Sequence, residues 1–180
     1  LPNGVRPGHL YGVGNKKLQI ANIGNKVLDE VKRLGIEPSD VVMDFLTIAL
    51  AVTAADTFVL RKDTANGWCR SLSITLPLCQ PDIWQANKTH LEQILHFLSG
   101  DIWQFNFQAG GKLPPQPHKL NSRAKLVDLR NKDCVCLFSG GLDSAIGAID
   151  LLEQGYSPVL VSHSYKGDKS RQQMIVEKFN

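Results

Sequence analysis

Residues 134–144 read Cys-Val-Cys-Leu-Phe-Ser-Gly-Gly-Leu-Asp-Ser, an apolar run of strand character that ends in a glycine turn. A helical pattern follows, so the glycines lie between a strand and a helix. Glycine lets the backbone approach an anion closely, and the free N–H groups at a helix start carry partial positive charge. Ser139 and Ser144 add hydroxyl donors, and Asp143 is placed to hold the magnesium ion that accompanies a nucleotide. The stretch therefore predicts a phosphate-binding loop.

A Walker A loop and an ordinary turn are the two other interpretations of this stretch. It lacks the Gly-Lys-Ser/Thr ending of a Walker A loop, whose lysine reaches the outer phosphates. An ordinary serine- and glycine-rich turn is the plainer alternative. The strand before the loop and the helix after it favour phosphate binding.

The residues around the loop predict an α/β arrangement. We expect a buried strand at Cys134–Phe138, a helix at Ser144–Gln154 and a second strand at Pro158–Ser162. Ile146, Ile149 and Leu152 are expected to face inward, Gly155 to end the helix, and a further helix to run from Lys169 to Asn180. A right-handed crossover makes the two strands parallel, and ligands of such sheets lie beyond the carboxyl ends of the strands. The segments that follow those ends are Ser139–Ser144 and Ser162–Tyr165.

The first 112 residues predict a separate, smaller α+β domain. Its expected first elements are a weak hairpin at His9–Ile20 and a helix from Asn25 to Leu34 that ends at Gly35. A second helix starts at Pro38-Ser39-Asp40, and the residues expected on one face of it are Val41, Val42, Phe45, Ile48, Ala49 and Val52. A hairpin of Phe58–Arg61 with Cys69–Leu78, a helix at Thr89–Leu98 and a strand at Ile102–Phe107 follow, and the residues of that helix expected to face inward are Leu91, Ile94, Leu95 and Leu98. Alternation of leucine and isoleucine with serine and threonine marks 72–78 as a strand with one buried face.

Residues 113–132 predict a proline-rich, basic linker, and residues 133–180 the first part of a nucleotide-binding domain. The chain lacks an initiator methionine and stops inside an expected helix, so we expect it to be a fragment.

Composition excludes some classes of function. The net charge of +3 is too mild to indicate nucleic-acid binding, and no apolar run free of polar residues is long enough to predict a membrane span. The cysteines at 69, 79, 134 and 136 form no Cys-x-x-Cys pair, and no secretion signal is visible. These features favour a cytoplasmic protein. Cys134 and Cys136 share a strand face, where small buried side chains are a better interpretation than zinc ligands.

The loop resembles the Ser-Gly-Gly-x-Asp-Ser motif of the PP-loop ATP pyrophosphatases, which cut ATP between the α and β phosphates. The x position is Leu142. Within that superfamily, residues 133–180 are most similar to 7-cyano-7-deazaguanine synthases, the QueC-like family, in which an aromatic residue such as Phe138 precedes the loop. The second strand there runs into a Tyr-Gly-basic segment, and here Lys166 intrudes between Tyr165 and Gly167.

The upstream part resembles the QueC-like proteins of the Qat anti-phage system. The similarity is carried by Ala55-Asp56, Arg61, Gly67-Trp68-Cys69-Arg70, Leu76-Pro77, Pro81-Asp82-Ile83-Trp84 and Leu98–Phe107. Arg61, Trp68, Arg70, Asp101 and Trp103 are recognisable, and packing or an ion pair is at least as good an interpretation of each as a functional contact.

The resemblance implies a HUP-type PP-loop domain that uses ATP and Mg²⁺. It implies cofactor-binding roles for Phe138, Ser139, Gly140, Gly141, Leu142, Asp143, Ser144 and His163, catalytic roles for Asp143 and Ser139, and metal binding by Asp143. Zinc would be bound only by a C-terminal part that is absent here, so Cys134 and Cys136 do not inherit that role.

The implied reaction is adenylation of a carboxylate with release of pyrophosphate, in anti-phage defence. The implied partners are ATP, a small-molecule or protein carboxylate, and other Qat proteins, with no membrane or nucleic acid. The alternatives are 7-cyano-7-deazaguanine synthesis, another PP-loop reaction such as tRNA thiolation or an amidotransferase or synthetase reaction, and a non-catalytic nucleotide-binding assembly subunit.

Overall fold

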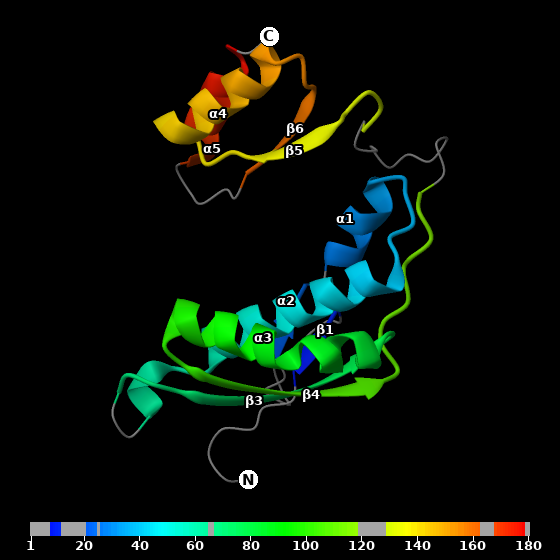
Figure 1. Cartoon of the computed structure of the whole chain (residues 1–180), viewed down its shortest axis with the longest axis vertical. Coiled ribbons are helices and arrows are strands. Elements are labelled where there is room, and N and C mark those ends of the chain that lie inside the picture. Colours follow the sequence, from blue (N-terminus) through cyan, green and yellow to red (C-terminus); the bar gives the residue numbers. More distant parts are fainter. Residues whose placement is uncertain are drawn as a thin grey trace. The chain divides into compact units, whose positions relative to one another are not determined.

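The computed structural model describes residues 8–11, 21–24, 26–64, 67–118, 129–162 and 168–178. The chain divides into two compact units, residues 1–126 and 127–180. Both units contain small parallel sheets, so the fold class is α/β (Figure 1).

The first unit is built on a parallel strand, helix, strand unit. Strand β3 (Ser71–Leu78) leads through helix α3 (Pro81–Ser99) to strand β4 (Ile102–Ala109). The two strands pair in parallel over their full length, from Ser71 opposite Ile102 to Leu78 opposite Ala109. The predicted hairpin of Phe58–Arg61 with Cys69–Leu78 is therefore wrong, and the sheet is of the α/β type rather than the expected α+β type.

The apolar run at Phe58 was misassigned because a short apolar segment fits a helix end as well as a strand. Phe58 is the last residue of helix α2 (Asp40–Phe58), and Arg61–Asp63 form a 3-10 turn. Ser39 caps α2 as expected, since its hydroxyl accepts the N–H of Val42 at 3.4 Å.

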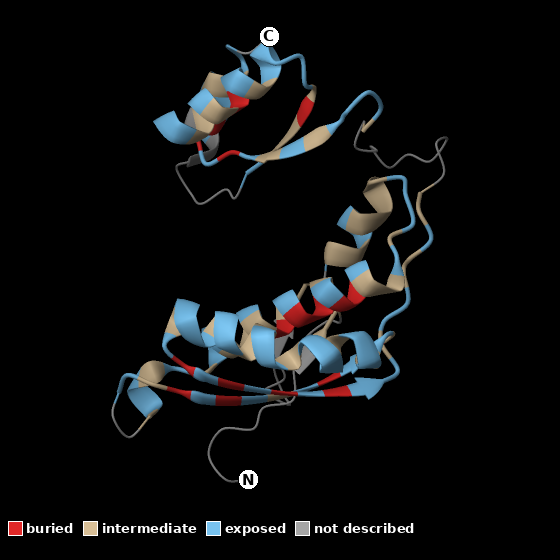
Figure 2. Cartoon of the chain, in the orientation of Figure 1, coloured by how far each residue is buried: buried red, intermediate tan, exposed pale blue. Residues whose placement is uncertain are grey.

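The core of the first unit lies between one face of the β3–β4 sheet and helices α2 and α3 (Figure 1). Its buried members are Ile48 and Ala51 on α2, Leu72, Leu76 and Leu78 on β3, and Trp103, Phe105 and Phe107 on β4. Alternation along both strands produces this face, as predicted for 72–78, and Figure 2 shows the buried positions alternating with exposed ones. The opposite face is exposed and mostly polar, with Ile102 as its large apolar residue.

The helix faces match the predicted ones only in part. Ile48 and Val52 on α2, and Leu91 and Leu95 on α3, contribute to the core as predicted. Val42 and Phe45 on α2, and Ile94 and Leu98 on α3, are exposed. The buried side of α2 carries Met43, Asp44, Thr47, Ile48 and Ala51. Apolar residues surround α2 almost completely, so its sequence does not specify which side meets the sheet.

The buried carboxylate of Asp44 on α2 has hydrogen-bond partners at the start of α3. Its Oδ1 accepts the N–H of Cys79 at 2.7 Å, and its Oδ2 accepts the N–H of Gln80 at 2.8 Å and the indole N–H of Trp84 at 3.2 Å. Asp44 thus caps the start of α3 from a neighbouring helix. This contact helps α3 to begin at Pro81, eight residues before the predicted start.

By length and composition alone, α2 could cross a membrane. In this structure it packs against β3, and its buried Asp44 bonds to three N–H groups of the same unit. We interpret α2 as the core helix of the first unit.

In the N-terminal segment, strands β1 (Gly8–Leu10) and β2 (Ala21–Ile23) pair in parallel. Most of the predicted hairpin at His9–Ile20 lies outside the described residues. Helix α1 (Val27–Arg33) follows. Lys26 is at its N-cap position without a side-chain capping bond, and the expected cap Asn25 is not described. Gly35, with φ +70°, lies just past the end of α1.

A buried ionic cluster closes the end of the unit where α3 meets β4. Asp101 is fully buried, and its carboxylate accepts hydrogen bonds from both terminal guanidinium nitrogens of Arg61, each at 2.9 Å. The same carboxylate accepts the backbone N–H of Arg70 at 2.8 Å and its Nε–H at 3.0 Å. Arg70 also donates to the carbonyls of Asp56 and Val59, at the end of α2. Three of the recognisable upstream residues therefore join α2, β3 and β4 in one structural cluster.

The second unit repeats the strand, helix, strand arrangement. Strand β5 (Cys134–Leu137), helix α4 (Leu142–Glu153) and strand β6 (Pro158–Val161) precede helix α5 (Asp168–Val176). The strands are parallel as predicted, with Cys134 opposite Pro158 and Leu137 opposite Val161.

Packing in the second unit differs from the prediction on both sides of the sheet. Ala148 is the buried residue of α4, whereas Ile146, Ile149 and Leu152 are exposed. Val135 and Leu137 on β5 are also exposed, and Cys134 and Cys136 are only partly buried. Close approach of α4 to a two-stranded sheet favours a small side chain at the contact, which leaves the larger apolar residues outward.

We expect Asp101→Asn to destabilise the first unit by about 3 kcal/mol, because it leaves the buried Arg70 guanidinium with only the exposed carboxylate of Asp56 as an ionic partner. Asp63→Asn, at an exposed position, should change the free energy of unfolding by less than about 0.5 kcal/mol. Urea unfolding of the two variants measures the difference, and equal small losses would contradict a stabilising role for the cluster.

The same cluster predicts a pH dependence. Burial by itself would raise the pKa of Asp101, but the hydrogen bonds and charge of Arg70, with the charge of Arg61, hold that pKa below the ordinary 3.8. Because the pKa of Asp101 is lower in the folded state than in the unfolded state, the ionised carboxylate stabilises the fold at pH values above the unfolded-state pKa. This stabilisation is lost as the pH falls through the folded-state pKa. Below about pH 4, the unfolding free energy of the native chain should fall more steeply than that of Asp101→Asn. Parallel slopes would contradict this assignment.

Candidate functional site

The candidate site is the loop that joins β5 to α4. Gly140 has φ +83°, a left-handed conformation that favours glycine, and Gly141 precedes the first residue of α4. The hydroxyls of Ser139 and Ser144 lie 3.1 Å apart. Ser139 Oγ also accepts the N–H of Gly141 at 3.3 Å, and Ser144 donates to the Gly141 carbonyl at 3.0 Å. The fold thus brings both predicted serines together at a helix start.

The first turn of α4 supplies the electrostatics of the loop. The first N–H groups of a helix have no acceptor within the helix, and α4 is twelve residues long, enough to build a helix dipole. Leu142 and Asp143 lie in this turn and are exposed. The loop can therefore present N–H groups, two hydroxyls and one carboxylate to a bound anion and its metal ion.

The donor set fits a nucleotide phosphate with magnesium. Hydroxyl and backbone donors bind phosphate oxygens, and Asp143 offers the hard oxygen ligand that Mg²⁺ prefers, with phosphate and water completing the coordination. In the described part of the chain, no group of three or more histidine, cysteine or acidic side chains could hold a metal by itself. Burial and the neighbouring Asp133 raise the pKa of the Cys134 thiol, which disfavours a thiolate ligand there.

Of the other predicted site residues, Phe138 is described and lies directly before the loop. It is 1% exposed, and its N–H donates to the Val161 carbonyl at 2.8 Å. Its ring therefore belongs to the core of the second unit, and its expected place near a nucleoside stays a prediction. His163 lies outside the described residues, as does Tyr165.

Gln172 on α5 is a loop contact that sequence reasoning missed. It is buried, and its Nε2 donates to the Ser139 carbonyl at 3.2 Å. The neighbouring Gln173 is exposed. Nothing in the sequence distinguishes the two adjacent glutamines.

The comparable turn of the first unit is closed by the protein itself. At the junction of β3 and α3, Asp44 already accepts the N–H groups of Cys79 and Gln80, so a carboxylate of the chain takes the place of a bound anion. Burial, together with Asp44 and Asp40, raises the pKa of the Cys79 thiol, which disfavours a nucleophilic thiolate. Of these two turns, the one between β5 and α4 is open to a ligand.

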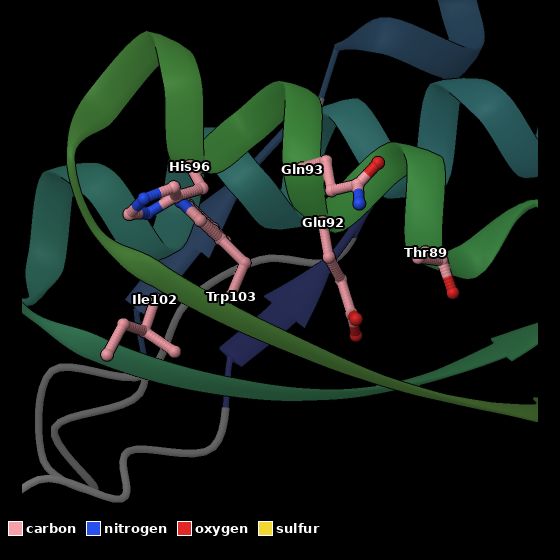
Figure 3. Close-up of a pocket in the computed structure, with 6 residues that line it drawn as sticks. All are labelled: Thr89, Glu92, Gln93, His96, Ile102 and Trp103. Carbon is pink, nitrogen blue, oxygen red and sulfur yellow. The ribbon is translucent and has the colours of Figure 1, made fainter.

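A shallow hollow of about 300 Å³ lies between α3 and β4 in the first unit (Figure 3). Its lining residues are Thr89, Glu92, Gln93, His96, Ile102 and Trp103. Glu92 accepts the N–H of Phe105 at 2.8 Å, and the His96 ring bonds to the Asp101 carbonyl at 2.9 Å. These polar groups serve the fold, and the hollow supplies no candidate chemistry.

No family model, curated protein or solved structure matches the chain. The resemblance to the PP-loop ATP pyrophosphatases therefore rests on the residues of the chain alone.

Proposed function

We propose that the loop between β5 and α4 binds the phosphates of ATP with Mg²⁺, and that the protein adenylates a carboxylate in the manner of the PP-loop ATP pyrophosphatases. The observation that carries this proposal is the pair of Ser139 and Ser144 hydroxyls, 3.1 Å apart at the start of α4, in a loop with the full Ser-Gly-Gly-x-Asp-Ser pattern. The parallel pairing of β5 and β6 supports it, because ligands of parallel sheets bind at the carboxyl ends of strands.

In the proposed reaction, a carboxylate oxygen attacks the α-phosphorus and the bond from that phosphorus to the bridging oxygen breaks. Pyrophosphate leaves with the bond electrons. An amine then attacks the acyl carbon of the adenylate, the bond from that carbon to the phosphate oxygen breaks, and AMP leaves with the bond electrons while the nitrogen loses a proton to solvent. The loop N–H groups and the serine hydroxyls bind and orient the phosphates, while Asp143 holds the metal ion that offsets their charge. Positioning and charge stabilisation supply most of such catalysis, so no side-chain nucleophile is required.

The QueC-like proteins of the Qat system provide the biological setting of the proposal. A small-molecule or protein carboxylate is the proposed substrate, other Qat proteins are the proposed partners, and anti-phage defence in the cytoplasm is the proposed context. 7-Cyano-7-deazaguanine synthesis, tRNA thiolation and the other PP-loop reactions share the loop chemistry and differ in the acceptor.

A non-catalytic assembly subunit is the second candidate. The observation that favours it is the exposure of several large apolar side chains in the second unit: Val135 and Leu137 on β5, and Ile146 and Ile149 on α4. Nucleotide binding without pyrophosphate release would support this candidate.

Asp143→Asn tests the proposed reaction. If Asp143 binds magnesium, the variant should keep its fold while magnesium-dependent pyrophosphate release falls by orders of magnitude, since the amide cannot carry the charge of the carboxylate. If Asp143 serves only the helix start, the loss should be the dipole interaction of a first-turn carboxylate, about 0.3–1 kcal/mol of stability, with activity intact. Asp150→Asn, at an exposed position on the same helix, is the matched control.

The assay measures AMP and pyrophosphate, with the anti-phage phenotype scored in parallel. Release of ADP and inorganic phosphate by the native protein would exclude the proposed mechanism. Undiminished pyrophosphate release by Asp143→Asn would contradict metal binding by Asp143 and indicate a structural role for this residue.

A further inference from the structure

Helix α5 packs directly over the loop at Gly140. A Cβ atom added to Gly140 would lie 2.8 Å from Cγ of Gln172 and 3.6 Å from its Cα. The loop thus packs against α5 at this point, and a larger residue at 140 would force the Gln172 side chain to shift. This close contact makes α5 a structural support for the loop.

Gln172 is a polar side chain in that contact, and it is 6% exposed. A buried amide without hydrogen bonds is costly, so a glutamine is expected at such a position only where its groups have partners. Its Nε2 donates to the carbonyl of Ser139 at 3.2 Å. That carbonyl belongs to the first peptide of the Ser-Gly-Gly turn.

The bond to Gln172 fixes the orientation of that peptide. A trans peptide is planar and its C=O and N–H point in opposite directions, and the described residues contain no cis peptide. When the Ser139 carbonyl is held toward α5, the Gly140 N–H must point away from α5. A flipped peptide would instead turn the carbonyl oxygen outward and repel an anion.

We propose that Gln172 is a positioning residue for the phosphate-binding loop: its amide holds the Ser139 carbonyl against α5 and so keeps the N–H of Gly140, itself a buried residue, turned away from α5 toward the anion. The proposal rests on the proposed function for the identity of the anion. It adds a contribution from α5, an element that lies outside the loop motif.

The test compares Gln172→Met with Gln173→Met in the intact protein. Methionine is close to glutamine in size but makes no amide hydrogen bond, and Gln173 is the exposed neighbour on the same helix. Binding of inorganic pyrophosphate with Mg²⁺ is measured by calorimetry, amide hydrogen exchange at Gly140 and Gly141 by NMR, and unfolding by urea.

Loss of one orienting hydrogen bond should weaken pyrophosphate binding by Gln172→Met roughly three- to tenfold and speed exchange at Gly140, while Gln173→Met matches the native protein. Gln172→Glu keeps the size and polarity of the side chain but replaces the donor by an acceptor, so it should lose at least as much affinity. This variant separates the hydrogen bond from a loss of packing, and affinities are compared for folded protein.

Native affinity and native exchange in Gln172→Met would overturn the proposal, as would equal losses in Gln173→Met. A loss of stability with unchanged affinity would also overturn it, since it would assign Gln172 to packing alone. If the native protein binds neither pyrophosphate nor ATP, the proposed function fails. The exchange rates at Gly140 then decide whether Gln172 orients the loop.

Discussion

Parallel strand pairing is the constraint on which both units depend. Two parallel neighbours cannot be joined by a tight hairpin, so the chain must cross over between them, here through α3 and through α4. Each crossover helix starts near the carboxyl end of the first strand, where its free N–H groups gather. The same requirement that pairs the strands therefore creates a site that attracts negative charge in each unit.

The two units differ in what accepts the free N–H groups at the start of the crossover helix. In the first, Asp44 reaches from α2 to the start of α3 and bonds to two backbone N–H groups and to Trp84. The contact is internal and stabilises the unit. In the second, the Gly-Gly turn leaves the start of α4 exposed and places two serine hydroxyls beside it. The difference between a structural turn and a candidate ligand site is whether the chain supplies its own anion.

Among the described residues of the second unit, few positions are buried. They include Phe138, Gly140, Ala148, Pro158 and Gln172, whereas Val135 and Leu137 on β5 are exposed. Parallel sheets are usually covered on both faces. With so few buried contacts, single interactions carry much of the order of the loop, which is why one amide on α5 can orient it.

Local sequence determined the features that depend on near neighbours in the chain. The Gly-Gly turn with its flanking serines, the parallel β5–α4–β6 unit, the alternating face of β3 and the glycines after α1, α3 and α4 were all readable, because backbone freedom and residue periodicity act over a few positions. Tertiary structure alone decided the rest. β3 pairs with β4 rather than with the segment at Phe58, α2 turns Asp44 inward, and Gln172 rather than Gln173 meets the loop. These choices depend on which distant surfaces fit together, since an apolar run suits either a strand or a helix and a buried polar group is stable only where its partner lies.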